Sequence, residues 1–243
     1  MKLSGLCDLH CHYVPAVDDG VRTTEDGRLL CQNLARLGYR TLIATPHIRR
    51  GMFDNDRAGL RRVYESFVAA VSGESGMPDT GLAAEHFYDE HFFELLESGN
   101  ALPYPGGHAA LVEFPPERIP VKVEERFFRM SVRGLRPVLA HPERYAQVWQ
   151  SIEPMERLSE RGVLLLLDLM SLTGKYGRRP QRAAEELLDA DLYYAACSDS
   201  HRPDDAEQVE RSLERLIELI GRDEALVLLA EHPRNILAGT VQD

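Results

Sequence analysis

The chain of 243 residues lacks several features that would assign it to a common class. No apolar run approaches the ~20 residues that cross a bilayer, so we expect no membrane-spanning segment. The four cysteines include no CxxC pair, which favours buried thiols in a reducing cytoplasm over disulfides or a thiolate metal site. Lysine occurs only three times, at Lys2, Lys122 and Lys175, and none of the three ends an apolar run.

Positive charge is also in short supply. The formal net charge is −11 at pH 7 and no basic patch offsets it, which argues against nucleic acid as a partner and against docking on an anionic membrane. The apolar content of 44% and the charged content of 28% are ordinary for a globular protein. Met1–Lys2 runs directly into an apolar segment without a secretion signal, so we expect one cytoplasmic domain over residues 1–243.

Short apolar runs alternate with segments of helical periodicity along the chain, which predicts an α/β fold with a parallel sheet. Seven runs predict strands, over 4–9, 41–44, 81–84, 109–112, 137–140, 163–167 and 193–197. Helices are expected over 24–37, 57–71, 92–96, 121–132, 152–161, 179–188, 207–220 and 223–231. Seven such units favour an incomplete or distorted barrel over an open doubly wound sheet, because only a barrel brings the first and last strands together.

A histidine or a carboxylate follows most of these apolar runs. After His10, the next ones come at His47, Glu85, Glu113 and His141, in steps of 37, 38, 28 and 28 residues. A strand with its returning helix takes about 30 residues, so each step places a ligand-type side chain at the same point of successive βα units. In a barrel these points converge on one face, which predicts a metal site built from the whole fold.

Polar pairs two positions apart reinforce this pattern near both ends of the chain. His10 and His12 point to the same side of an extended strand, so the two rings can hold one cation. Asp199 and His201 repeat that spacing after the last strand. Asp8 precedes His10 by the same interval, and we expect its carboxylate to orient a histidine.

The turn that follows the first strand holds two adjacent carboxylates, Asp18 and Asp19. An Asp-capped turn is the structural alternative, but beside the histidine pair we expect one carboxylate to face inward, and we prefer Asp19. Asp168, at the end of the sixth strand, is a weaker candidate for a place beside the site. The side chain of Cys11 is expected to face away from the ligands. The remaining histidines, His86, His91, His108 and His232, fall outside the pattern.

The expected ligands are imidazoles and carboxylates without a thiolate, a set that suits Mn, Zn or Fe rather than a structural zinc. Nine such side chains are more than one ion can bind. We therefore expect two or three divalent ions with a bridging glutamate. Clustered divalent ions lower the pKa of a shared water and clamp the oxygens of an in-line displacement, which is phosphoester chemistry. The expected ligands are His10, His12, Asp19, His47, Glu85, Glu113, His141, Asp199 and His201.

At these residues the chain resembles the PHP (polymerase and histidinol phosphatase) superfamily. The matching residues are Asp8-x-His10-x-His12, Asp19-Gly20, Thr45-Pro46-His47, Glu85, Glu113, His141-Pro142 and Ser198-Asp199-x-His201. More narrowly, the chain is similar to bacterial protein-tyrosine phosphatases encoded with capsule and exopolysaccharide genes. The narrower motifs are His12-x-x-Pro15-x-x-Asp18-Asp19-Gly20, Ala84–Asp89, His141–Tyr145, Ser171–Gly177 and His232–Leu237.

The resemblance implies a distorted (β/α)7 TIM-like barrel of the PHP type with a trinuclear metal cluster, often of manganese. The usual substrate of the family is the phosphotyrosine-rich tail of a bacterial tyrosine autokinase that controls polysaccharide assembly. The ion sites implied are His10, His12, Glu85 and Asp199 for one ion, Asp19, His47 and His201 for a second, and Glu85, Glu113 and His141 for a third.

Arg144 is the expected phosphate clamp, because a guanidinium offers a bidentate fork to phosphate oxygens. The chain departs from the family pattern at residue 16, which is Ala where the family typically has Gly. The family also tends to place an arginine a few residues beyond its last histidine, and here only Arg202 is near. Substitutes for that arginine in the loop after the sixth strand are Lys175, Arg178 and Arg179.

A histidinol-phosphatase-like enzyme of the same superfamily is the main alternative function, and we expect some of those enzymes to carry His at the position of Glu113. Amidohydrolases also open with an HxH pair, but many need a carboxylated lysine where this chain has Glu113. A catalytically silent metal-binding regulator is a third alternative, which the complete ligand set disfavours. The net charge of −11 disfavours a PHP nuclease.

Overall fold

The computed structural model describes residues 3–241, so the expectation about Met1–Lys2 falls outside the described residues. The strands are β1 Leu6–Cys11, β2 Tyr39–Ala44, β3 His47–Ile48, β4 Asp79–Leu82, β5 Glu85–Phe87, β6 Ala109–Glu113, β7 Arg136–Ala140, β8 Leu164–Asp168 and β9 Tyr193–Cys197. The helices are α1 Thr24–Leu37, α2 Arg57–Ala70, α3 Glu90–Ser98, α4 Val123–Val132, α5 Glu153–Glu160, α6 Arg178–Asp189, α7 Asp205–Ile220, α8 Arg222–Leu226 and α9 His232–Ala238. Between residues 3 and 241, no helix combines the length and apolar character needed to cross a membrane.

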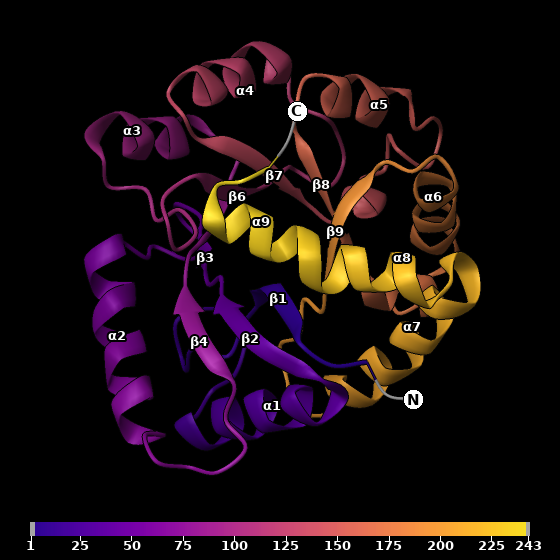
Figure 1. Cartoon of the computed structure of the whole chain (residues 1–243). Helices are drawn as coiled ribbons and strands as arrows, with labels where there is room; N and C mark the ends of the chain where they lie inside the picture. The colour runs from indigo at the N-terminus through magenta and orange to yellow at the C-terminus, as the bar shows by residue number, and fades with distance from the viewer. Residues whose placement is uncertain (1–2, 242–243) are drawn as a thin grey trace.

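The strand pairs between these elements are all parallel, which confirms the α/β class predicted from the alternating pattern. One sheet has the order β1-β2-β4 and the other has the order β3-β5-β6-β7-β8-β9. Figure 1 shows helices α1 to α7 arranged around the outside of the strands, while α9 crosses in front of β1 and β9. The long apolar run at β8 is buried on both faces, as its composition predicted.

The second and third predicted strands are each followed by a further short strand after a gap, which the sequence pattern did not indicate. β2 ends at Ala44 and the chain resumes as β3 at His47, while β4 ends at Leu82 and resumes as β5 at Glu85. The pairing keeps its register across both gaps, since Ala44 faces Leu82 and His47 faces Glu85. Pro46 lies in the first gap, where it offers no N–H to a ladder. The two gaps therefore lie next to each other, and β3 pairs with β5 just as β2 pairs with β4.

β1 links the two sheets near their carboxyl ends. On one side the Thr45 N–H donates to the Cys11 carbonyl at 3.0 Å. On the other side the His12 N–H donates to the Ser200 carbonyl at 2.9 Å, and the Asp199 N–H donates to the carbonyl of residue 10 at 2.9 Å. Over residues 3–241 the strands thus form two parallel sheets joined at one end, rather than one continuous hydrogen-bonded cylinder.

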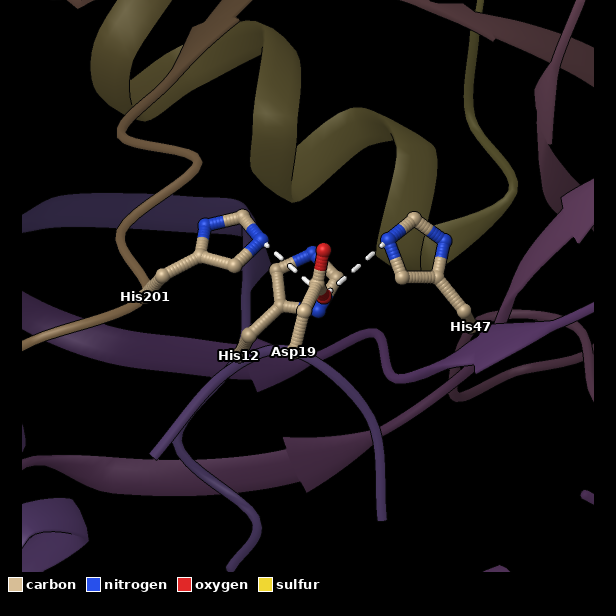
Figure 2. A group of neighbouring side chains, drawn as sticks. All are labelled: His12, Asp19, His47 and His201. Atoms are coloured by element: carbon tan, nitrogen blue, oxygen red, sulfur yellow. Dashed lines mark ion pairs between the residues drawn. The ribbon is translucent and has the colours of Figure 1, made fainter. Parts of the chain in front are cut away.

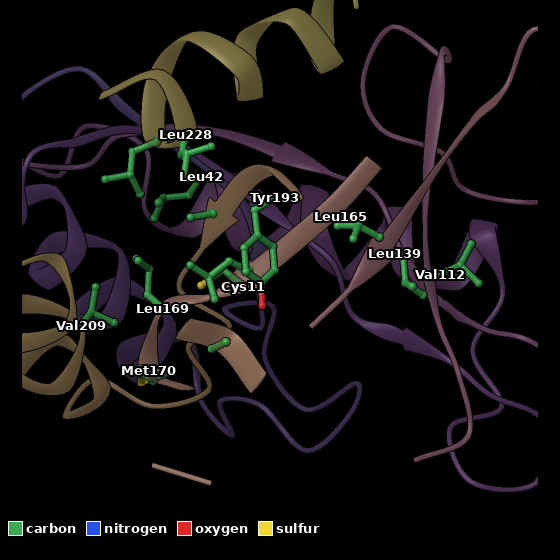
Figure 3. Close-up of a cluster of buried hydrophobic side chains, with 14 of the residues drawn as sticks. Cys11, Leu42, Val112, Leu139, Leu165, Leu169, Met170, Tyr193, Val209 and Leu228 are labelled. Carbon is green, nitrogen blue, oxygen red and sulfur yellow. The ribbon is translucent and has the colours of Figure 1, made fainter. Parts of the chain in front are cut away.

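Alternate strand residues belong to two buried clusters. The smaller cluster lies between the strands and includes Leu9, Leu111 and Val138, with Ile236 of α9 at one end. The larger cluster, part of which is drawn in Figure 3, packs residues such as Leu139 against the helices. Closely packed apolar side chains therefore support the carboxyl ends of the strands.

The last helical segment extends beyond its predicted end at residue 231. A π-helical turn, Val227–Glu231, leads directly into α9. Pro233 lies in the first turn of α9, where its missing N–H is tolerated. The π-helical turn before it absorbs the change in hydrogen-bond register, so the chain stays helical through Ala238. Arg234 then donates to the Gly5 carbonyl, which holds α9 against the start of β1.

Replacing Leu111 by alanine removes apolar volume from the cluster between the strands. We expect the free energy of unfolding to fall by about 3 kcal/mol, because buried Leu→Ala changes cost roughly 2–5 kcal/mol. Chemical denaturation followed by circular dichroism measures this loss. Val121→Ala, at an exposed position, is the control and should change stability by less than about 0.5 kcal/mol. Equal losses in the two variants would contradict this packing.

Candidate metal centre

The predicted ligands come together at the carboxyl ends of the strands. They lie on β1, β3, β5 and β6 or in the loops that follow β1, β7 and β9. Their nitrogen and oxygen atoms form overlapping groups, and within each group all atoms lie within 4.8 Å of one another. The groups are His12, Asp19, His47 and His201; His10, His12 and Glu85; His10, His141 and Asp199; and His47, Glu85 and Glu113.

Glu85 connects three of the histidines. Its Oε2 lies 3.1 Å from His10 Nε2 and 3.0 Å from His47 Nδ1, and its Oε1 lies 3.0 Å from His141 Nε2. Burial alone would raise the pKa of Glu85, but His10 and His47 hold that pKa well below its usual range. A buried carboxylate that uses both oxygens in this way has the geometry of a bridging ligand.

Several nitrogen and oxygen atoms crowd together beside the rings of His10 and His12. The Nε2 atoms of the two rings are 3.1 Å apart. Asp199 Oδ1 lies 3.2 and 3.4 Å from these nitrogens, yet it is buried and makes no hydrogen bond. Imidazole nitrogens and carboxylate oxygens that face one another this closely fit a divalent cation, which also offsets the buried negative charge.

Asp19 stands on the open side of the centre. Figure 2 shows its carboxylate between two imidazoles, with Oδ1 3.5 Å from Nε2 of both His47 and His201. A hydrogen bond from His201 holds the pKa of Asp19 below its usual value. The side chain of Asp19 is 53% exposed whereas that of Glu85 is 1% exposed, so the centre meets solvent on the side of Asp19.

Glu113 lies near His141, Glu85 and His47. Its Oε1 is 4.0 Å from His141 Nε2, and its closest group contains His47 and Glu85. Burial and the charge of Glu85 raise the pKa of Glu113 to about 8. A cation placed between two such carboxylates would favour the ionised form of both.

Irregular backbone aims several of the ligands inward. Leu9 of β1 faces the cluster between the strands, and the pairing of β1 with β2 shifts its register between Asp8 and Cys11. This shift lets His10 and His12 turn toward the same interior, because a bulge re-aims the side chains that follow it.

Left-handed backbone serves the same purpose at two other ligands. His141 has φ +35° and Asp199 has φ +45°. Such angles are uncommon for residues with a Cβ and are found at functional sites. Ala16 has φ +58°, which explains why a family pattern would place Gly at this position.

Asp18, which was ranked below Asp19, is buried and holds His12. Its Oδ2 lies 2.8 Å from His12 Nδ1 and accepts from the His47 N–H at 3.1 Å, while Oδ1 accepts from the Gly20 N–H at 2.9 Å. Burial alone would raise the pKa of Asp18, but His12 lowers it. The carboxylate thus fixes the ring with Nε2 directed into the centre. In the sequence, its place beside Asp19 and in the motif that ends at Gly20 pointed to it.

Asp8 does not orient a histidine ring, contrary to expectation. Its Oδ1 accepts from the backbone N–H of Ser198 at 3.0 Å and from that of His10 at 3.3 Å. Burial raises the pKa of Asp8 to about 6. The carboxylate therefore fastens the backbone of β1 to the chain after β9.

Arg144 lies beside the ligands, as predicted for a phosphate clamp. Its Nη1 donates to Asp199 Oδ2 at 2.6 Å and is 3.5 Å from Asp168 Oδ2, and its guanidinium lies 4.4 Å from the centre of the Tyr176 ring. Burial alone would lower the pKa of Arg144, but Asp199 and Asp168 raise it. Asp168 therefore faces the site through Arg144, and Tyr176 is a neighbour that sequence reasoning missed.

The other expected substrate contacts are placed less directly. Lys175 Nζ pairs with Asp205 at 2.9 Å. Arg178 begins α6 and is exposed, and Arg202 is exposed with its backbone N–H bound to Asp205. Within residues 3–241, none of these three side chains makes a hydrogen bond or an ion pair to a predicted ligand.

The cysteines and His86 have structural roles, as expected. All four cysteines are free and buried, and burial raises the pKa of Cys7 to about 12. Cys11 Sγ points to the Ser200 carbonyl at 3.5 Å, away from the ligands. His86 Nδ1 donates to the Leu111 carbonyl and its Nε2 accepts from the Leu102 N–H, both at 3.1 Å. The centre therefore has no thiolate nucleophile.

Comparison with known proteins places the chain in a family. Residues 6–238 match the family described as capsular polysaccharide synthesis, CpsB/CapC. The chain belongs to this family, and the resemblance drawn from the motifs is confirmed.

Related proteins cover most of the chain. Tyrosine-protein phosphatase YwqE of Bacillus subtilis (strain 168) is 29% identical over 198 residues, which span 81% of this chain and 77% of YwqE. Tyrosine-protein phosphatase CpsB of Streptococcus pneumoniae is 24% identical over 241 residues, which span 96% of this chain and 98% of CpsB. A crystal structure from work on these same two proteins, described as unique metal-dependent tyrosine phosphatases, matches with a TM-score of 0.90 at 26% identity, covering 98% of this chain and 96% of that one.

Asp18→Asn removes the charge that holds His12 without changing the size of the side chain. We expect manganese affinity to fall by roughly 10- to 100-fold, because partners that orient a ligand histidine contribute that much. Isothermal titration calorimetry with manganese measures the change. Asp54→Asn, on an exposed turn, is the control and should leave the affinity unchanged. Equal affinity in the two variants would show that Asp18 does not set the position of His12.

Proposed function

We propose that this protein is a metal-dependent protein-tyrosine phosphatase that acts on the tyrosine-phosphorylated tail of a bacterial autokinase in capsule or exopolysaccharide synthesis. The observation that carries the proposal is the convergence of imidazole and carboxylate side chains beside the Arg144 guanidinium. Family membership and the named activity of the relatives point in the same direction.

Two or three divalent ions, manganese foremost, are the proposed cofactors. The proposed ligands are His10, His12, Asp19, His47, Glu85, Glu113, His141, Asp199 and His201. Bound ions of this kind supply an acidified water and neutralise charge on phosphoryl oxygens. The donor set has no thiolate and is rich in carboxylates, which suits manganese, and zinc or iron are the alternatives.

Arg144 is the proposed catalytic arginine. Asp199 and Asp168 hold the guanidinium from one side and Tyr176 supports its face, which leaves the remaining N–H groups free to bind phosphate oxygens. Asp199 uses Oδ2 for Arg144 and directs Oδ1 to the histidines. One carboxylate therefore sets the distance between the phosphate clamp and the metal ligands.

The fold proposed for the whole chain is a distorted (β/α)7 barrel, in which β2 with β3 and β4 with β5 each count as one interrupted strand. We propose a single domain over residues 1–243. A cytoplasmic location suits the four free, buried cysteines. Nucleic acid is not a proposed partner because of the charge of −11.

A panel of phosphatase substrates tests this function. We expect protein loaded with manganese to hydrolyse phosphotyrosine peptides faster than phosphoserine peptides or histidinol phosphate, and chelation to abolish turnover that manganese restores. Release of inorganic phosphate is the measurement. Faster hydrolysis of histidinol phosphate would favour the small-molecule alternative. Full manganese occupancy with turnover near the uncatalysed rate would instead indicate a silent metal-binding regulator.

Arg144→Lys keeps the charge but removes the planar fork. We expect kcat/KM for a phosphotyrosine peptide to fall by about 10- to 100-fold, because a lysine cannot replace a bidentate contact to phosphate. Manganese content should stay at the wild-type level. Arg157→Lys, on the surface of α5, is the matched control. The role assigned to Arg144 is wrong if both variants keep wild-type kcat/KM.

A further inference from the structure

A second arginine follows from the strand geometry around His47. Arg49 comes two residues after His47, and successive residues of an extended chain alternate sides, so the two side chains leave the backbone in the same direction. The same spacing relates Glu85 to Phe87 on the neighbouring strand β5, where His47 pairs with Glu85. Arg49 therefore lies next to Phe87, and each comes two residues after a predicted ligand, His47 or Glu85.

The Arg49 guanidinium has no polar partner within residues 3–241. Its Cζ lies 4.0 Å from the centre of the Phe87 ring, and the side chain is half-buried. No hydrogen bond or ion pair joins it to another described side chain. Arg144 also lies over an aromatic ring, but two aspartates neutralise it. A half-buried guanidinium without a counter-charge is the more available of the two for an anion.

A short hairpin fixes Arg49 in place. The Arg49 N–H donates to the Phe53 carbonyl at 3.1 Å and the Phe53 N–H donates to the Arg49 carbonyl at 2.8 Å. Asn55 Nδ2 donates to the carbonyls of Val17 and His47, both at 2.8 Å. The Phe53 ring stacks on His47, with ring centres 5.1 Å apart. Arg49 is thus held by a rigid segment rather than by a free loop.

Arg49 and Arg144 flank the same carboxylate. Glu113 ends β6, which lies between β5 on the side of Arg49 and β7 on the side of Arg144. Phe87, the residue under Arg49, pairs directly with Glu113. The fold therefore brings Arg49 and Arg144 to opposite sides of the strand that ends at Glu113.

We propose that Arg49 binds the phosphoryl group of the substrate from the side opposite Arg144. This inference rests on the proposed phosphatase function. The guanidinium fork of Arg49 donates to phosphoryl oxygens while Phe87 supports its face. In this role Arg49 takes the place of the second arginine of the family pattern, while Lys175 pairs with Asp205.

Two substitutions separate a phosphate contact from a packing role. Arg49→Met keeps a long apolar stem over Phe87 but has no charge, and Arg49→Lys keeps the charge without the fork. Arg50→Ala removes the adjacent exposed arginine and is the matched control. Each variant is loaded with manganese, and its metal content and melting temperature are recorded. The two readouts are kcat/KM for a phosphotyrosine peptide and the Kd of inorganic phosphate by calorimetry.

We expect Arg49→Met to lower kcat/KM and to raise the phosphate Kd, each by roughly 10- to 100-fold, with Arg49→Lys in between and Arg50→Ala within twofold of wild type. Metal content should not change. Wild-type phosphate affinity in Arg49→Met overturns the inference, as does a loss matched by Arg50→Ala. If wild-type protein hydrolyses no phosphoester but binds phosphate through Arg49, the anion site stands and the proposed function fails.

Discussion

The burial of several carboxylates and imidazoles at one end of the strands is the constraint on which the rest of the structure depends. Glu85 and Asp199 are held ionised by histidines, whereas the pKa of Glu113 rises to about 8 because burial and Glu85 oppose its charge. Cations among these atoms would offset the buried negative charge. The strained backbone at His141 and the register shift in β1 follow from bringing these side chains to one place.

The sequence predicted those ligands that continue the regular alternation of a strand. Glu113 follows Leu111 by two residues, and Leu111 faces the cluster between the strands, so its inward direction follows from the period of a strand. The inward turn of His141 could not be predicted in this way, because it depends on a left-handed residue that periodicity does not reveal. His10 and His12 were found from their spacing, although the register shift that aims them inward was not.

Other differences between expectation and structure have local causes. Asp18 and Asp19 are chemically identical neighbours, and only the three-dimensional structure shows that Asp18 is the buried one that holds His12. The short strand β3 follows Pro46, beyond the end of the strand that the apolar run predicted. Pro233 suggests a stop, but a π-helical turn just before it lets the helix continue. At Pro233 a backbone adjustment outweighs the pattern of side chains.

The hydrogen bonds between β1 and the chain after β9 join the two ends of the sequence. Asp8 Oδ1 accepts from the Ser198 N–H, 190 residues away, and His10 and Asp199 meet in the same region. Closing so long a loop costs more entropy than forming a local βα unit, and contacts of this kind therefore form more slowly. A chain still being synthesised therefore carries incomplete sets of donor atoms until its last strand has emerged. The proposed metal centre is therefore completed only when residues from both ends of the chain have come together.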